Sequence, residues 1–214
     1  MILHGYWRSS AAYRVRIALA LKGVAYEQVT HDLRTGAQRD DAYRALNPQA
    51  MVPALDTDEG LLVQSPAILE WIEERYPEPA LLPAARDDRA VVRAMAALVA
   101  CDIHPLNNLR VQTALRRDLG VDDAAVATWI ARWIADGFAA LETLIARHGR
   151  GFAFGDSPGL ADCVLVPQVY SAERFGVDLG PYPALVAAAA RARELDAFLA
   201  AHPERQPDAP ATLS

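Results

Sequence analysis

The sequence predicts a small mixed α/β domain followed by an all-helical (all-α) domain. Short strand patterns alternate with helical patterns only within the first 80 residues, and only helical patterns occur beyond residue 88. Between the two parts, three prolines fall within the seven residues from Pro77 to Pro83, which favours a stiff linker. The predicted boundaries are 1–80 for the α/β domain, 77–87 for the linker and 88–214 for the helical domain.

The α/β domain is predicted to contain four strands and three helices in the order βαβ-αββα. Ser9-Ser10 precedes the first helix and Gly23 closes it. Asp58-Glu59-Gly60 is a turn signal between the third and fourth strands. Ser65-Pro66 opens the last helix, with the serine as N-cap and the proline at the first helical position. The elements are expected over residues 2–5, 12–22, 26–29, 37–46, 52–56, 61–63 and 65–76.

The helical domain is predicted to contain four long helical segments. Apolar residues recur at helical spacing over 88–118, where Pro105 must kink or break the helix. A second apolar stripe runs over 122–148 and ends at Gly149. Two further helices are expected over 160–175 and 183–199.

Composition and charge exclude several classes of protein. With 52% hydrophobic and 22% charged residues, the chain is neither disordered nor fibrous. The net charge is −6 and no block rich in lysine and arginine occurs, which argues against a nucleic-acid partner. Cys101 and Cys163 form no CxxC pair, so we expect no metal site. We expect a cytoplasmic protein with no membrane partner, because there is neither a signal-peptide pattern nor a run of about 18 apolar residues.

Three short motifs in the α/β domain are candidates for ligand binding. Ser9, at the start of a helix, is either a simple N-cap or a hydroxyl that holds a thiolate or another anion. Val52-Pro53 is either part of an ordinary edge strand or a cis bond that turns the Val52 backbone outward to pair with an extended peptide. Gln64-Ser65-Pro66 either caps a helix or binds a carboxylate through the free N–H groups at the helix start.

Taken together, these motifs resemble those of the glutathione transferases. The closer likeness is to the zeta class, the maleylacetoacetate isomerases and their maleylpyruvate isomerase relatives. The resemblance rests first on the stretches 7–10, 49–55 and 64–68. Supporting stretches at 14–19, 101–108, 165–169 and 206–208 extend it over almost the whole chain.

The resemblance implies an N-terminal thioredoxin-like domain, an all-α C-terminal domain, a homodimer, and glutathione as the cofactor. It places Ser9 beside the glutathione sulfur, with Ser10 and Ala11 forming the helix start around it. Val52 would pair with the cysteinyl backbone of the tripeptide. The other cofactor-binding residues that it implies are Gln64 and Ser65 at the γ-glutamyl end, Gln38 at the glycyl carboxylate, and Asp102, His104 and Asn108 from the helical domain.

The activity implied by the resemblance is glutathione-dependent cis–trans isomerisation of a maleyl keto acid, in the breakdown of aromatic amino acids or hydroxybenzoates. A thiolate adds to the cis double bond, the resulting single bond rotates, and the thiolate leaves. Maleylacetoacetate is the favoured substrate and maleylpyruvate the alternative. A transferase that conjugates or dehalogenates small acids is a competing class, and a non-catalytic binding module is a third.

The expected substrate is a dicarboxylate anion, so arginines are expected near the reacting sulfur. Arg8, directly before the serine, is the first candidate for a catalytic and substrate-binding arginine. Arg110 and Arg174 are candidates from the helical domain. Each of the three has the simpler alternative of a surface arginine, and His104 has that of a helix-end residue.

Two positions depart from the zeta-class pattern. Ala11 stands where that pattern has a cysteine, a substitution that maleylpyruvate isomerases share. Gly159 stands where the family has a serine or threonine at the N-cap of a helix in the helical domain. Asp162 can still accept a hydrogen bond from the N-cap amide there, but the reciprocal side-chain bond is lost.

Overall fold

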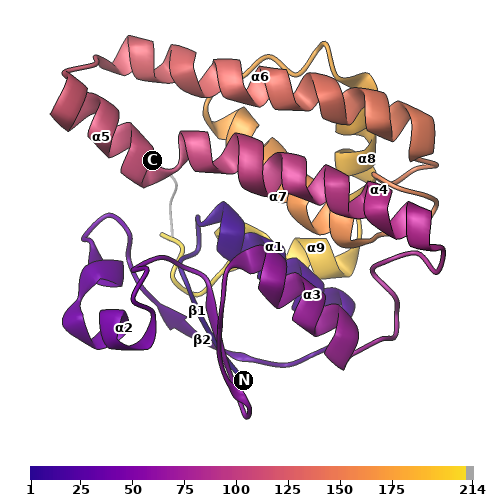
Figure 1. Cartoon of the computed structure of the whole chain (residues 1–214), viewed down its shortest axis with the longest axis horizontal. Helices are drawn as coiled ribbons and strands as arrows, with labels where there is room; N and C mark the ends of the chain where they lie inside the picture. The colour runs from indigo at the N-terminus through magenta and orange to yellow at the C-terminus, as the bar shows by residue number, and fades with distance from the viewer. Residues whose placement is uncertain (211–214) are drawn as a thin grey trace. The chain divides into compact units, whose positions relative to one another are not determined.

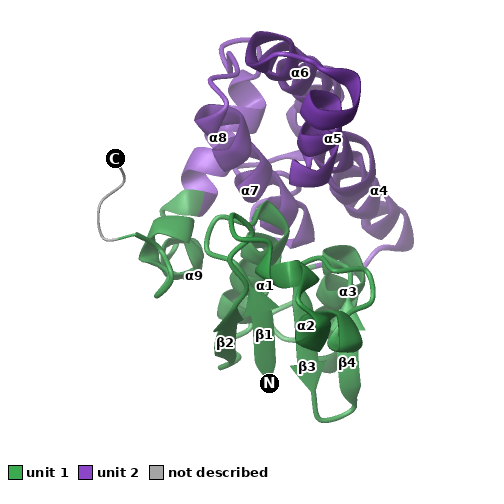
Figure 2. Cartoon of the chain, turned by 90° about the vertical axis from the view of Figure 1, so that its left-hand side faces the viewer, with its two compact units in different colours: residues 1–81, 193–214 green, residues 82–192 purple. Residues whose placement is uncertain are grey.

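A four-stranded mixed sheet organises the N-terminal part of the chain in the computed structural model, which describes residues 1–210. Its strands are β1 (Ile2–Gly5), β2 (Glu27–Thr30), β3 (Ala54–Thr57) and β4 (Gly60–Val63). The order across the sheet is β2-β1-β3-β4 (Figure 2). β1 runs parallel to β2 and antiparallel to β3, and β3 pairs antiparallel with β4. This sheet and its order of elements confirm the predicted βαβ-αββα arrangement.

Helix α1 (Ser10–Leu21) is central among the helices of this part. α1 contacts both α3 (Ser65–Arg75) and α9 (Asp196–Ala201), as Figure 1 shows. The connection between β2 and β3 holds a 3-10 turn, η1 (Ala37–Arg39), and the short helix α2 (Asp41–Leu46). The sequence predicted one helix over 37–46. It divides because Asp40, between the two pieces, is extended (φ −62°, ψ 144°).

Two compact units make up the chain (Figure 2). One contains Met1–Leu81 and the C-terminal segment that begins at Arg193, and the other contains Leu82–Ala192. The predicted helical domain of 88–214 differs from this division, because the C-terminal segment packs on the first unit through α9. The predicted helix over 183–199 is likewise two helices, since Leu195 is extended (φ −78°, ψ 139°) at the start of α9.

The named elements that the structure describes in the second unit are all helical, and an isolated β-bridge joins Gly149 and Gly155. Pro105 lies in a 3-10 segment, η3 (His104–Asn107), which confirms the predicted break in the first long helical stretch. The other elements are α4 (Arg86–Ala97), the π-helical η2 (Leu98–Ile103), α5 (Leu109–Leu119), α6 (Asp123–His148), α7 (Leu160–Arg174) and α8 (Pro183–Arg193).

One helical stretch, Arg86–Leu119, is long enough and locally apolar enough to meet a length-and-hydropathy criterion for a membrane span. Core helices of water-soluble proteins meet the same criterion, so this is weak evidence for a membrane segment. The stretch is also broken by the η2 and η3 segments and contains Pro105. The stretch contains no uninterrupted run of about 18 apolar residues, so the sequence predicted no membrane span there.

Helix α7 begins with a one-sided cap. Gly159 occupies the N-cap without a side-chain bond, and Asp162 Oδ2 accepts a hydrogen bond from Gly159 N at 2.9 Å, as predicted. Asp162 Oδ1 accepts a second bond, from Ala153 N at 2.8 Å, which was not predicted from the sequence. Burial raises the pKa of Asp162 to about 7, and the two N–H donors oppose that rise.

The raised pKa of Asp162 predicts a pH dependence of stability. Because the folded-state pKa of about 7 lies above the value near 3.9 of an unfolded aspartate, the folded chain holds this proton more tightly. This contribution to stability is complete below about pH 4 and is lost as pH rises through 7. Relative to Asp162→Asn, the wild type should lose about 1.4 kcal/mol of unfolding free energy per pH unit between pH 5 and 7. Urea unfolding of both proteins at several pH values measures the difference, and a flat difference would show that Asp162 stays ionised.

Candidate active site

Ser9 occupies the N-cap of α1, where the sequence placed it. Its Oγ accepts a hydrogen bond from Ala12 N at 3.2 Å, and its own N–H donates to Tyr6 O at 3.0 Å. An N-cap hydroxyl that accepts one bond retains its proton for another acceptor. The capping role and the anion-binding role of Ser9 are therefore compatible. The start of α1 also adds the positive end of a twelve-residue helix to this position.

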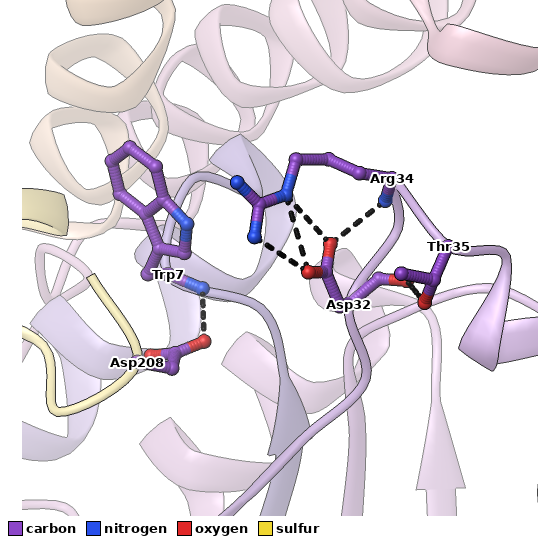
Figure 3. A network of polar contacts seen from close by, with 5 residues as sticks. All are labelled: Trp7, Asp32, Arg34, Thr35 and Asp208. Atoms are coloured by element: carbon purple, nitrogen blue, oxygen red, sulfur yellow. Dashed lines mark hydrogen bonds and ion pairs between the residues drawn. The ribbon is translucent and has the colours of Figure 1, made fainter. Parts of the chain in front are cut away.

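Arg8 lies against Trp7, with its guanidinium carbon 5.5 Å from the centre of the indole ring. The charge of Arg8 also contributes to lowering the pKa of Asp32, whose main cause is the hydrogen bond from Arg34. Asp32 and Arg34 form a bidentate pair, at 3.0 Å from Nε to Oδ1 and 2.7 Å from Nη2 to Oδ2 (Figure 3). Arg34 thus pairs with this carboxylate, and Arg8, directly before Ser9 in the chain, is half-exposed.

The Val52–Pro53 bond is cis, which agrees with the second of the two interpretations of this motif. The preceding carbonyl, Met51 O, is held by two donors, Tyr43 Oη at 2.7 Å and Asn47 Nδ2 at 2.8 Å. Val52 is half-buried, and its own backbone groups make no hydrogen bond within residues 1–210. A backbone segment fixed from behind with free N–H and C=O groups is able to pair with an extended peptide.

Gln64 and Ser65 stand at the start of α3, but Ser65 is not the N-cap that the sequence predicted. The helix begins at Ser65, so Gln64 rather than Ser65 is the N-cap residue. Ser65 is buried, with 4% of its surface exposed. Its Oγ accepts a hydrogen bond from Arg14 Nη1 at 3.1 Å instead of capping the helix. Gln64 has φ +70°, unusual for a residue with a side chain, and its Nε2 donates to Gln49 Oε1 at 2.6 Å. Such backbone conformations concentrate at ligand-binding positions.

Gln38 lies in η1 with only 7% of its surface exposed. Its Oε1 is buried without a hydrogen-bond partner in the described part of the chain. A buried amide without its partner is costly, and such groups commonly mark a ligand or water position. This is consistent with the role predicted for Gln38 at a carboxylate, since the amide offers Nε2 as donor once it turns over.

The first unit therefore holds a set of groups that fits glutathione. A hydroxyl and a helix start are suited to its thiolate, the free Val52 backbone to its central peptide, and the strained start of α3 to a terminal carboxylate. The unpartnered amide of Gln38 is a further polar contact. Seven of the predicted cofactor-binding residues belong to this unit: Ser9, Ser10, Ala11, Gln38, Val52, Gln64 and Ser65.

The predicted residues of the second unit lie in two places. Asp102, His104, Asn108 and Arg110 are close in sequence, from η2 to the first turn of α5. Asn108 is the N-cap of α5, and its Oδ1 accepts from Arg110 N at 3.1 Å, which gives it a structural role. Arg174 is the last residue of α7, with its guanidinium carbon 4.6 Å from the centre of the Phe175 ring. The functional roles of these five residues stay predictions.

Two buried arginines of α1 support the candidate site and were not predicted from the sequence to do so. Arg14 and Arg16 are 2% and 1% exposed, although each is charged and lies in the apolar stretch of 12–19. Arg14 supports Ser65, as described above, and Arg16 binds backbone carbonyls before Ser9. The available signal was their place within a helix whose neighbours on all sides are apolar, which leaves no polar face for an arginine.

Comparison with known proteins shows the family to which the chain belongs. Residues 3–80 match the family model of the glutathione S-transferase N-terminal domain, and residues 123–203 match that of the C-terminal domain. A maleylpyruvate isomerase of Ralstonia sp. is 55% identical over 211 residues, which cover 97% of this chain and 99% of the relative. A maleylacetoacetate isomerase of Pseudomonas aeruginosa is 54% identical over 214 residues, covering 99% of this chain and 100% of the relative.

Solved structures give the same result. A holo maleylpyruvate isomerase, described as a bacterial zeta-class glutathione S-transferase, has a TM-score of 0.96 at 54% identity and covers 98% of this chain and 100% of its own. A maleylacetoacetate isomerase of Methylobacterium extorquens, solved with malonate and glutathione bound, has a TM-score of 0.95 at 40% identity. The match covers 99% of this chain and 100% of the isomerase chain. The chain therefore belongs to the glutathione S-transferase family, in the zeta class of maleylacetoacetate and maleylpyruvate isomerases.

Proposed function

We propose that this protein is a glutathione-dependent cis–trans isomerase of a maleyl keto acid, and that it converts maleylacetoacetate to fumarylacetoacetate. The observation that carries the proposal is the Ser9 hydroxyl at the start of α1, in the same unit as the free Val52 backbone and the Gln64–Ser65 turn. The malonate and glutathione bound in the solved relative support binding of both a small dicarboxylate and the tripeptide.

When bound, glutathione supplies a thiolate nucleophile that is returned unchanged at the end of the reaction. Ser9 stabilises the negative sulfur with a hydrogen bond from its Oγ, and the start of α1 adds its positive potential. Both effects are needed because a free thiol has a pKa near 8.5. Arg8, supported by the Trp7 ring, binds a substrate carboxylate and stabilises the negative charge that develops next to it.

The backbone of Val52 and the start of α3 hold the glutathione tripeptide at its centre and at one end. Val52 pairs with the cysteinyl peptide group, while Gln64 and Ser65 bind the γ-glutamyl end. Fixing the tripeptide at points away from the sulfur limits the motion of the nucleophile and raises its effective concentration. The roles of five residues of the helical unit stay predictions: Asp102, His104, Asn108, Arg110 and Arg174.

Replacing Ser65 with alanine tests this division of roles. We expect the Kd for glutathione to rise about tenfold or more, because a hydrogen bond to a charged group is lost. The kcat at saturating glutathione should stay within about threefold of the wild type, since Ser9 is unchanged. Calorimetric titration with glutathione measures Kd, with Ser157→Ala as the matched control at an exposed serine. An unchanged Kd would remove Ser65 from the binding site.

The isomerase of maleylpyruvate is the second candidate function. Ala11, where the zeta pattern has a cysteine, and the 55% identity to a maleylpyruvate isomerase favour it. An absorbance assay on both keto acids, with and without glutathione, separates the two. A rate at least tenfold higher with maleylacetoacetate supports the main proposal, the reverse ratio supports the alternative, and activity on neither supports a conjugating transferase.

We further propose that the protein is a homodimer in the cytoplasm. Only 28% of the apolar window in Arg86–Leu119 is buried in the single chain, and a second copy would cover part of the remainder. Size-exclusion chromatography with light scattering should give twice the 23.2 kDa of one chain. A mass of one chain at micromolar concentration would contradict the dimer.

A further inference from the structure

The C-terminal segment returns to the turn that carries Arg8 and Ser9. Asp208 Oδ2 accepts a hydrogen bond from Trp7 N at 2.8 Å, a contact between residues 201 positions apart (Figure 3). Asp208 Oδ1 accepts from Gln28 Nε2, in strand β2, at 3.0 Å. Both oxygens of this carboxylate are thus bonded to the first unit, one of them to the backbone directly before the proposed active-site residues.

Arg16 holds the same turn from the side of α1. Its Nη2 donates to Trp7 O at 2.9 Å and its Nη1 makes a longer bond to Tyr6 O at 3.5 Å. Its Nε donates to Ala201 O at 3.0 Å, at the end of α9. One buried guanidinium therefore links the Tyr6–Trp7 backbone to the C-terminal segment. Asp208 makes a second link between the same two parts through its bond with Trp7 N.

The geometry of the C-terminal segment is itself fixed. Gln206, which is buried, donates from Nε2 to Ala200 O at 3.0 Å and to His202 O at 2.9 Å. Ala209 N donates to Gln206 O at 3.0 Å and closes a turn around Asp208. These contacts hold the segment around Asp208 in a defined position.

These contacts lead to Ser9 through two short paths. Tyr6 O, which Arg16 binds, also accepts from Ser9 N at 3.0 Å. Trp7, whose N–H Asp208 binds, carries the ring against which Arg8 lies. A displacement of the Tyr6–Trp7 backbone would therefore move both the hydroxyl and the guanidinium that the proposed reaction uses.

We propose that Asp208 is a positioning residue for the reaction: by binding Trp7 N it fixes the turn from which Ser9 and Arg8 reach the sulfur and the substrate. This inference rests on the proposed function, because it assigns Asp208 a role through Ser9 and Arg8. Hydrogen bonds from backbone N–H groups to a carboxylate are short and strong, which suits this task. Displacements of about 1 Å in a reacting group can lower the rate about a hundredfold.

The test compares Asp208→Ala with Asp208→Asn in the full-length protein. Alanine removes both bonds, whereas asparagine keeps an acceptor for Trp7 N and can donate to the side-chain oxygen of Gln28. We expect alanine to lower kcat about tenfold and to raise the pKa of the bound glutathione thiol, read from thiolate absorbance in the ultraviolet. The KM for glutathione should change less than threefold, because Val52 and Ser65 are untouched, and asparagine should recover most of kcat.

The matched control is Glu204→Gln, which removes one negative charge from the same segment at an exposed position away from Trp7. It should leave kcat and the thiol pKa unchanged. If Asp208→Ala has normal kcat and a normal thiol pKa, Asp208 does not position the site. The same follows if Asp208→Asn has a kcat as low as that of Asp208→Ala. Equal losses in the Glu204 and Asp208 variants would show an effect of charge alone and would also overturn the inference.

A double-mutant cycle separates failure of this inference from failure of the proposed function. If Asp208 acts through Ser9, adding Asp208→Ala to Ser9→Ala should produce little further rise in the thiol pKa. A normal thiol pKa in Ser9→Ala alone would instead overturn the proposed role of Ser9. A raised pKa in Ser9→Ala together with a normal pKa in Asp208→Ala would overturn only the role of Asp208.

Discussion

Replacing Ser9 with alanine is expected to lower glutathione-dependent turnover about a hundredfold. The variant removes the hydroxyl donor that stabilises the thiolate, and the loss of one such donor to a developing anion typically costs a factor of 10² to 10³, or about 3–4 kcal/mol. The pKa of the bound thiol should rise by at least about one unit, toward the value near 8.5 of a free thiol. Stopped-flow turnover and ultraviolet titration of bound glutathione measure the two effects.

The capping role of Ser9 requires a control, because alanine also removes the acceptor for Ala12 N. Loss of an N-cap typically costs about 1 kcal/mol of stability, which urea unfolding will detect independently of activity. Ser9→Thr keeps both a donor and an acceptor and should retain most of the activity. Full activity in Ser9→Ala would mean that another group stabilises the thiolate.

Replacing Asp162 with alanine is expected to destabilise the helical unit by about 3–5 kcal/mol. The carboxylate accepts from two backbone N–H groups, Ala153 N and Gly159 N, and both lose their partner. Each buried donor left without an acceptor costs about 1–3 kcal/mol. The side chain is also fully buried, so the truncation leaves a cavity at the start of α7.

Urea-induced unfolding, followed by circular dichroism, measures this loss. Asp156→Ala is the matched control, because Asp156 is an exposed acid in the same loop and should change stability by less than about 0.5 kcal/mol. A loss below about 1 kcal/mol in Asp162→Ala would show that water replaces the carboxylate as acceptor for both N–H groups.

The features that the sequence predicted correctly depend on local chemistry. The serine before α1 caps that helix, Pro105 breaks the first long helical stretch, and Asp162 reaches back to the amide of Gly159. Each follows from rules that relate residues only a few positions apart. The cis Val52–Pro53 bond also agrees with one of the two local interpretations of that motif.

The features that the sequence did not predict depend on contacts between distant residues. Ser65 was expected to cap α3, but its hydroxyl binds Arg14, 51 positions earlier. The expected helix over 183–199 divides at Leu195, and the following segment packs on the first unit, where Asp208 reaches Trp7. Periodicity describes which face of a helix is apolar, but it does not say which other segment covers that face.

The most direct test of the proposed function compares glutathione with S-methylglutathione in the isomerisation of maleylacetoacetate. S-methylglutathione offers the same groups to Val52, Gln64 and Ser65 but has no thiol to ionise. The proposal predicts turnover with glutathione, recovery of that glutathione unconsumed, and no turnover with the methylated tripeptide, which should act as a competitive inhibitor. Equal turnover with both, or consumption of one glutathione for each substrate converted, would contradict isomerisation by a returning thiolate.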